Sequence, residues 1–193
     1  MAVDVARQLA QQELSATLPR RWRHVQAVAE RAACLATAPD IDGEELTAAA
    51  WLHDIGYAPR LVETAFHPLD GARHLRRLGT VSERVVCLVA HHSCAVIEAD
   101  ERGLADDLLT EFAREETPTA DALWYADMTT GPDGQHVRVG ERLAEIRCRY
   151  GPGHVVTRFI DRAEPQIVAA VERTDARLVT IGMAQSPSPS SLD

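Results

Sequence analysis

The sequence predicts an all-α protein, and its composition supports this fold class. Alanine is abundant, aromatic residues make up only 5% of the chain, and runs of β-branched residues are scarce, a composition that favours packed helices over a sandwich or barrel. The length of 193 residues and the hydrophobic share of 46% suit one compact domain. We therefore expect a single helical domain over residues 1–183, followed by a disordered Ser/Pro-rich tail at 184–193.

Proline, glycine and capping residues set the expected helix boundaries in the first part of the chain. A helix over 2–17 ends before Pro19, because the residue before a proline is pushed out of the helical region. A second helix covers 20–38. A third opens after Asp42, which has the spacing of a loose capping box, and stops at Gly56.

Two of the later helices, at 68–79 and 118–131, begin at a proline in the first helical position, where its missing N–H costs nothing. Residues 97–116 are acidic and weakly periodic, so we expect short helices and a loop there that could act as a lid. The last helix is expected to break or kink at Pro165. The remaining expected helices span 68–79, 81–93, 118–131, 135–150 and 154–181.

Charge and cysteine usage exclude several classes of protein. The net charge of −9 provides no basic field for a nucleic-acid backbone, which disfavours a module that binds duplex DNA or RNA. The four cysteines form no C-x-x-C pair, which argues against a zinc ribbon or a disulfide framework. No apolar run approaches the ~18 residues of a membrane span, and the start of the chain lacks a secretory pattern. We expect a soluble, cytoplasmic protein.

Polar residues occupy positions on the third helix where the core is expected. Leu46, Ala49 and Ala50 form a stripe at helical spacing whose next members are His53 and Asp54. An imidazole and a carboxylate thus take places where leucine or alanine would be usual. Burying them without partners would cost several kcal/mol.

The same anomaly occurs on other expected helices. Each places an imidazole or a carboxylate on its packing side, and these residues are His24, His91, His92 and Asp127. Taken singly, each could be a hydrogen-bonded core residue. Taken together, side chains of this type from several helices can satisfy one another by sharing a cation, which is how metal sites are built inside helical bundles.

The order of these residues resembles a known signature. His24, then the doublet His53-Asp54, then Asp127 is similar to the H…HD…D pattern of the HD-domain superfamily of metal-dependent phosphohydrolases. The first histidine follows an arginine-rich helix start, and the doublet ends the alanine-rich segment AAAWLHDIG. The resemblance covers about residues 20–130 and implies an HD-domain-like helical bundle, with helices at 135–183 added to it.

Additional histidines resemble the larger ligand set of the two-metal HD subgroups. These are His67 and the pair His91 and His92, of which either one could ligate directly. The resemblance implies that Asp54 bridges two divalent ions. His24, His53 and Asp127 would complete one site, and His67, His91 and His92 the other. Nitrogen and oxygen donors without thiolate favour iron or manganese, with zinc also suitable.

The resemblance implies hydrolysis of a phosphomonoester or phosphodiester by a metal-activated hydroxide. The expected substrate is a nucleotide or another small phosphorylated metabolite. Arg20 and Arg60 are the candidates for binding its phosphate. His74, two turns after His67, is the candidate general acid, and Asp54 is the central catalytic carboxylate.

Two other functions fit the same ligand set. One is an HD-type oxygenase that cleaves a carbon bond at a mixed-valent di-iron centre. The other is a non-catalytic, metal-stabilised nucleotide-binding module. The C-terminal helices alternate Glu and Arg, which is typical of solvated faces, and they could also provide a contact between two copies in a homodimer.

Overall fold

The computed structural model describes residues 2–180 and residue 182. Over this range the chain forms α-helices and short 3-10 helices, and the only β-type pairing there is an isolated bridge between Thr130 and His136. The predicted all-α fold class is thus confirmed. The tail expected at 184–193 lies outside the described residues. Among the helices described, none combines the length and the apolar character that crossing a membrane requires.

The elements follow one another with short connections. The α-helices are α1 (Ala2–Leu14), α2 (Pro19–Leu35), α3 (Gly43–Leu52), α4 (His67–Leu78), α5 (Glu83–His91), α6 (Ala95–Arg102), α7 (Ala105–Glu111), α8 (Pro118–Met128), α9 (Val139–Tyr150) and α10 (Val155–Thr180). The 3-10 helices are η1 (Ile55–Tyr57), η2 (Pro59–Leu61) and η3 (His92–Cys94).

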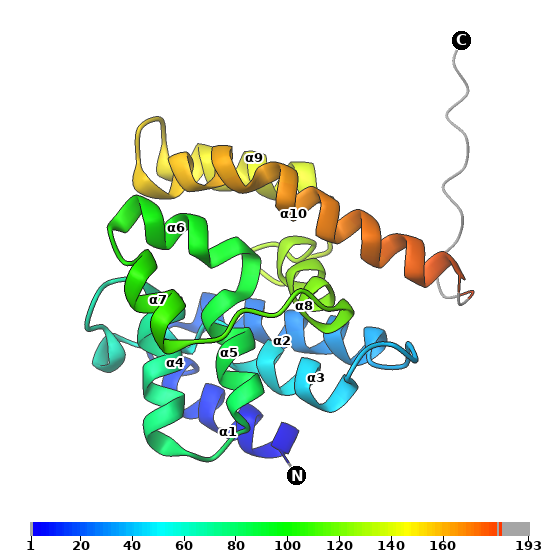
Figure 1. Ribbon diagram of the computed structural model, residues 1–193, viewed down its shortest axis with the longest axis horizontal. Coiled ribbons are helices and arrows are strands. Elements are labelled where there is room, and N and C mark those ends of the chain that lie inside the picture. Colours follow the sequence, from blue (N-terminus) through cyan, green and yellow to red (C-terminus); the bar gives the residue numbers. More distant parts are fainter. Residues whose placement is uncertain (1, 181, 183–193) are drawn as a thin grey trace.

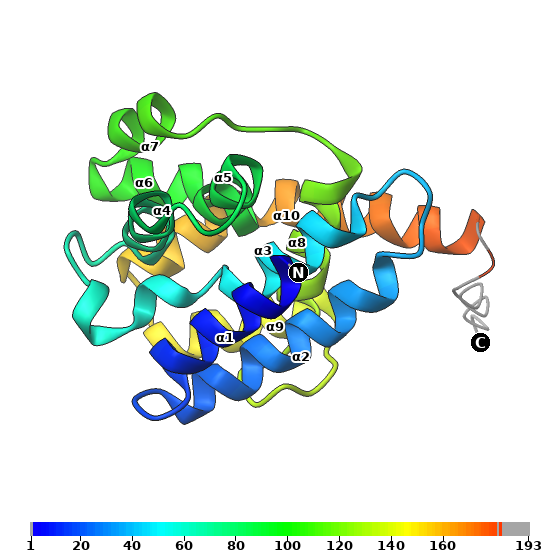
Figure 2. The same cartoon turned by 90° about the horizontal axis from the view of Figure 1, so that it is seen from below.

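Helix α3 lies at the centre of the bundle. Its residues Leu46, Ala48, Ala49, Ala50 and Leu52 have no exposed surface. Helices α1 and α2 pack along one side of α3, and α5 and α8 along another (Figures 1 and 2). The small alanine side chains let these neighbours approach closely, so the end of α3 lies deep in the protein.

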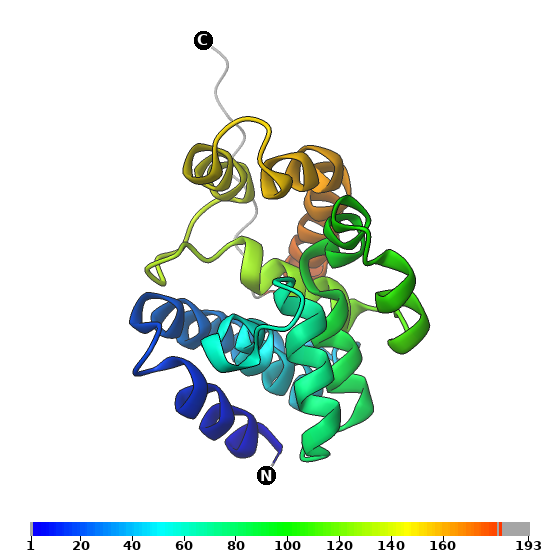
Figure 3. The same ribbon diagram turned by 90° about the vertical axis from the view of Figure 1, so that its left-hand side faces the viewer.

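Helices α9 and α10 form a hairpin that lies across one side of this bundle. Figures 1 and 3 show the hairpin as a separate layer above α6 and α8. It has its own small apolar core, in which Leu143 and Phe159 of the hairpin pack with Met128 of α8. Helix α10 continues through Pro165, so the helix does not break there, which was one of the two outcomes that the sequence suggested. Buried residues on both sides of the proline, Ile160 and Ile167, hold both halves against the same core.

Two expected helix ends differ from the structure at residues of the expected metal site. Helix α3 ends at Leu52 rather than at Gly56, and α5 ends at His91 rather than at Ser93. The segment at 97–116 forms most of α6, all of α7 and a following loop, as expected, and Leu108 of α7 is fully buried. The ends of α3 and α5 therefore each fall directly before a histidine of the expected metal site, His53 and His92.

A close approach between η1 and α4 fixes where α4 begins. Gly56 of η1 packs against the backbone of α4, where a Cβ atom on Gly56 would overlap the carbonyl oxygen of His67 and lie 2.7 Å from the backbone nitrogen of Gly71. Only glycine fits at this position. The contact holds His67 near Asp54, which immediately precedes η1.

Replacing Gly56 tests this contact. We expect Gly56→Ala to lower the free energy of unfolding by about 1–3 kcal/mol, because the added methyl group must push backbone against backbone. Urea unfolding measures the change. Gly140→Ala in α9 is the matched control, because a Cβ atom there meets nothing within 4 Å, and it should change stability by less than about 1 kcal/mol in either direction. Equal effects of the two substitutions would contradict the packing argument.

Candidate metal centre

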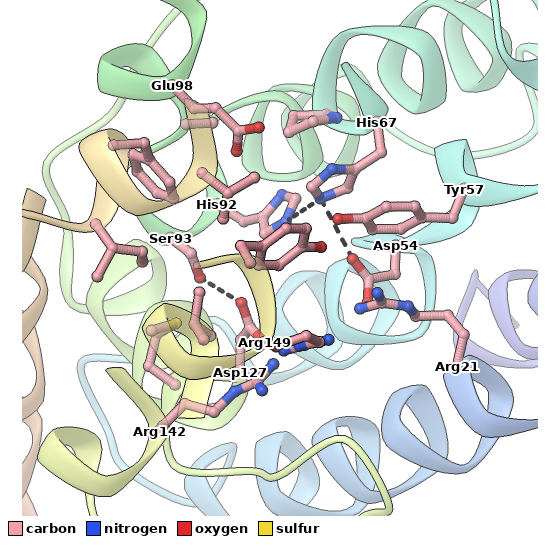
Figure 4. A pocket seen from close by; sticks show the side chains of 18 residues that line it. Arg21, Asp54, Tyr57, His67, His92, Ser93, Glu98, Asp127, Arg142 and Arg149 are labelled. Carbon is pink, nitrogen blue, oxygen red and sulfur yellow. Dashed lines mark hydrogen bonds and ion pairs between the residues drawn. The ribbon is translucent and has the colours of Figure 1, made fainter. Parts of the chain in front are cut away.

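Side chains from separate helices meet at one buried place. His24 comes from α2, His53 and Asp54 follow α3, and Asp127 comes from α8. His67 opens α4, and His92 follows α5 (Figure 4). All are buried except His67, which is partly exposed. The structure thus brings together six of the residues that the sequence analysis proposed as ligands.

The six residues form two adjoining groups. Within each group the candidate ligand atoms all lie within 4.8 Å of one another, and the groups are His24, His53 and Asp127, and Asp54, His67 and His92. In the first group, the Asp127 Oδ1 atom lies 3.1 Å from His24 Nε2 and 3.9 Å from His53 Nε2. In the second, His67 Nε2 lies 3.2 Å from His92 Nε2.

Asp54 lies between the two groups. Its Oδ2 atom is 3.3 Å from His53 Nε2 and 3.8 Å from His24 Nε2. Its Oδ1 atom is 3.3 Å from His67 Nε2. One carboxylate therefore turns one oxygen to each group, which is the arrangement that a ligand shared by two cations requires.

Backbone carbonyls orient the imidazoles. The Nδ1 atom of His53 lies 2.8 Å from the carbonyl oxygen of Ala50, and that of His92 lies 2.7 Å from the carbonyl oxygen of Val89. His24 makes the same contact, at 3.0 Å, to the carbonyl of Gly131. A carbonyl oxygen can only accept, so Nδ1 carries the proton in each ring. In the neutral ring, Nε2 then presents a lone pair to the cluster, as in a metal-ligating histidine.

The helix ends supply these carbonyls. The last four carbonyls of an α-helix have no partner within the helix, and Ala50 and Val89 lie in the last turns of α3 and α5. His53 and His92 each come directly after such an end and bind the carbonyl three residues earlier. The same hydrogen bond, from Nδ1 to the carbonyl oxygen three residues earlier, therefore orients both imidazoles.

The electrostatics around His53 and Asp54 favour added positive charge. Burial acts to lower the pKa of the His53 imidazole, but the neighbouring carboxylates of Asp54 and Asp127 outweigh it and raise this pKa to about 9. Burial acts to raise the pKa of the Asp54 carboxyl, but Arg21 and His53 hold it well below its usual range. A proton on Nε2 or a metal cation would satisfy the same demand. Nε2 of His53 is buried and has no hydrogen-bond partner.

His91 does not join the cluster, although the sequence analysis proposed it as a ligand together with His92. The helix stops between the two residues, and His92 has extended backbone angles (φ −62°, ψ 150°). The following residues Ser93 and Cys94 have positive φ values of 47° and 63°. This turn separates the two imidazoles, and His91 Nε2 lies 2.9 Å from the carbonyl oxygen of Phe112 instead.

The residues proposed for phosphate binding and acid catalysis also lie elsewhere. Arg20 is exposed and pairs with Asp133 at 2.9 Å. Arg60 is exposed and pairs with Glu13 of α1. His74 belongs to neither group of candidate ligands, and burial lowers its pKa. The sequence analysis placed these residues by their closeness along the chain, which does not fix the direction of a side chain.

Arg21, rather than Arg20, is the arginine that contacts the cluster. Its Nη1 atom donates to Asp54 Oδ2 at 2.7 Å, and its guanidinium lies 4.1 Å above the ring of Tyr57. Tyr57 in turn stacks on the imidazole of His67, with ring centroids 4.0 Å apart. A helical count from His24 could have found Arg21, because residues three apart share a helix face.

A pocket that is partly open to solvent lies directly over the cluster (Figure 4). Asp54, His67, His92 and Asp127 all line it. The α9–α10 hairpin supplies the facing side chains, which include Arg142, Arg149, Tyr150 and Phe159. Glu98 of α6 also lines the pocket, and burial raises its pKa.

The sequence analysis missed this contribution of the hairpin. The signal was present, since residues 142, 146, 149 and 150 fall on one face of a helix. Without a motif in this region, the arginines on that face could not be distinguished from solvated surface residues.

Comparison with known proteins adds a partial relative. Over 78 residues the chain is 40% identical to a tRNA (cytidine(56)-2'-O)-methyltransferase of Thermoplasma volcanium. The match covers 40% of this chain and 22% of that protein. The chain thus spans about a fifth of the relative's length. No solved structure matches significantly.

The family model for the HD domain matches residues 21–131. This range is more than half of the chain and contains all six clustered residues. The family supports a metal-dependent function of the hydrolase type. The match, the all-α fold and the two His/Asp groups agree, and the chain belongs to the HD domain family.

Proposed function

We propose that the protein is a metal-dependent phosphohydrolase that acts on a nucleotide or another small phosphorylated metabolite. The observation that carries this proposal is the position of Asp54, which turns one carboxylate oxygen to each of two groups of imidazole nitrogens. A pocket opens over the same carboxylate and is lined by residues of both groups, among them His67, His92 and Asp127.

The donor set fits two divalent cations. His24, His53 and Asp127 would hold one ion, and His67 and His92 the other, with Asp54 shared between them. Imidazole and carboxylate without thiolate suit iron or manganese, and zinc is also compatible. Such a pair of cations supplies a nucleophilic water at neutral pH and neutralises charge on phosphate oxygens.

The residues around the ligands would position them and the substrate. Ser93 donates a hydrogen bond to Asp127 Oδ2, which leaves Oδ1 to face His24. Arg21 donates to the same oxygen of Asp54 that faces His53. Its guanidinium would therefore lie beside a phosphate bound at the cations and can hydrogen-bond to the phosphate oxygens.

A small substrate is favoured over RNA. The partial relative is named for an action on tRNA, but the chain covers only 22% of it. The net charge of −9 provides little attraction for an RNA backbone. The candidate ligands other than His67 are buried, and a small substrate can reach them more readily than an RNA strand can.

Metal stoichiometry tests the ligand assignment. We expect the manganese- or iron-loaded protein to hold about two ions per chain, because the structure offers two groups of donors. His92→Ala should lose one ion, and Asp54→Ala should lose most of both. His91→Ala is the matched control and should keep both ions, since its imidazole faces Phe112. Elemental analysis after dialysis measures the content, and equal losses from His91→Ala and His92→Ala would contradict the assignment.

Phosphate release tests the reaction. We expect the metal-loaded protein to release phosphate from at least one member of a panel of nucleotides and phosphate esters. Asp127→Asn should lower kcat by at least about 100-fold, because it weakens a cation ligand in the reacting cluster. Ser93→Ala should lower activity by about 10–100-fold through the orientation of Asp127.

The outcome also separates the proposed reaction from other uses of the same ligands. No phosphate release from the whole panel by fully loaded protein would refute the proposal. Substrate-dependent oxygen uptake by the iron-loaded protein would instead indicate an oxygenase.

A further inference from the structure

We propose that Arg142 and Arg149 of α9 form an anion subsite that binds a phosphate group of the substrate. This inference rests on the proposed function, since it concerns the same pocket. Both arginines lie outside residues 21–131, which match the HD domain family. Both nevertheless line the pocket that contains Asp54 and Asp127.

Arg142 is buried with an unused donor. Only 5% of its surface is exposed. Its Nη1 atom donates to Glu145 at 2.6 Å, but its buried Nε atom has no hydrogen-bond partner. A buried donor without an acceptor is unfavourable, particularly on a charged group. An anion in the pocket would supply the missing acceptor.

A single carboxylate holds both arginines. Glu145 Oε2 accepts from Arg142 Nη1 at 2.6 Å and from Arg149 Nη2 at 2.9 Å. Two guanidinium groups against one carboxylate leave one positive charge in excess on this wall. This local excess is notable in a chain whose net charge is −9. Figure 4 shows both guanidinium groups directed into the pocket, on the side of Asp127.

The helix that carries the arginines is firmly held. Leu143 and Ile146 of α9 are buried in the small core of the hairpin. Arg147, on another face of α9, pairs with Asp161 of α10 at 2.8 Å. Because the buried side chains of Leu143 and Ile146 hold α9 in place, the arginines are preorganised, and a ligand would not have to order them.

Phosphate is the anion that this geometry suits best. A guanidinium offers parallel N–H donors that match two oxygens of a phosphate group. The bound group could be the phosphate held at the cations or a second phosphate of the same substrate. Both cases share the same chemistry, and the choice of substrate in the test distinguishes them.

Phosphate binding tests the subsite directly. Inorganic phosphate is titrated calorimetrically into the metal-loaded protein and into Arg142→Met, Arg149→Met and Arg147→Met. We expect Arg142→Met and Arg149→Met to raise the Kd for phosphate about 10- to 100-fold, the effect of losing a hydrogen bond to a charged group. Arg142→Lys should recover only part of the loss, because it restores the charge without the paired donors.

Arg147→Met is the matched control on the same helix. It should leave phosphate binding within about twofold of the parent protein, since exposed ion pairs contribute little. Thermal unfolding of every variant separates loss of the subsite from loss of the fold. Unchanged phosphate binding in folded Arg142→Met and Arg149→Met would overturn the proposal.

Steady-state kinetics then identify which phosphate is bound. If Arg142→Met raises KM for a phosphomonoester, the subsite holds the phosphate at the cations. If it raises KM only for a diphosphate ester, the subsite holds a second phosphate. An unchanged KM for both would again overturn the inference. Calorimetry does not require turnover, so failure of the hydrolase proposal and failure of the anion subsite are distinguishable.

Discussion

The structure depends on the burial of two carboxylates that need positive charge beside them. Asp54 is 3% exposed and Asp127 is 7% exposed. Carboxylates in such positions are stable only when they are paired or bind a cation. Imidazoles that backbone carbonyls orient surround both carboxylates. The carbonyl groups of Ala50 and Val89 are available for this because α3 and α5 end just after these two residues. The helix ends, the histidine orientation and the buried charge are therefore parts of one arrangement.

Two layers of the structure line the pocket, and they provide different side chains. The bundle from α2 to α8 carries the six clustered side chains, and the family match covers this part. The α9–α10 hairpin lies beyond the match and provides the opposite wall, with arginine and aromatic side chains. Cation binding would then be encoded in the bundle, and substrate recognition, apart from the contribution of Arg21, in the hairpin. This separation allows one layer to change its ligand while the other keeps its chemistry.

Periodicity predicted the helices and the inward direction of His24, His53 and Asp127, because an apolar stripe constrains which face is buried. It did not predict how the polar residues at helix ends would turn. The turn at Ser93 and Cys94, where φ is positive, separates His91 from His92. Serine and cysteine seldom adopt positive φ, so nothing in the sequence indicated this turn. Long-range pairs were likewise hidden, such as Arg60 with Glu13, which are 47 positions apart. Side chains that depend on tertiary packing require the structure itself.

The central claim is that the six residues share two cations with Asp54 between them. Crystals of the manganese- or iron-loaded protein, measured on both sides of the metal absorption edge, test it most directly. We expect two anomalous peaks about 3.5–4 Å apart, one beside His24, His53 and Asp127 and the other beside His67 and His92. A fully loaded crystal without a peak at this cluster, or with its metal bound elsewhere on the protein, would contradict the account.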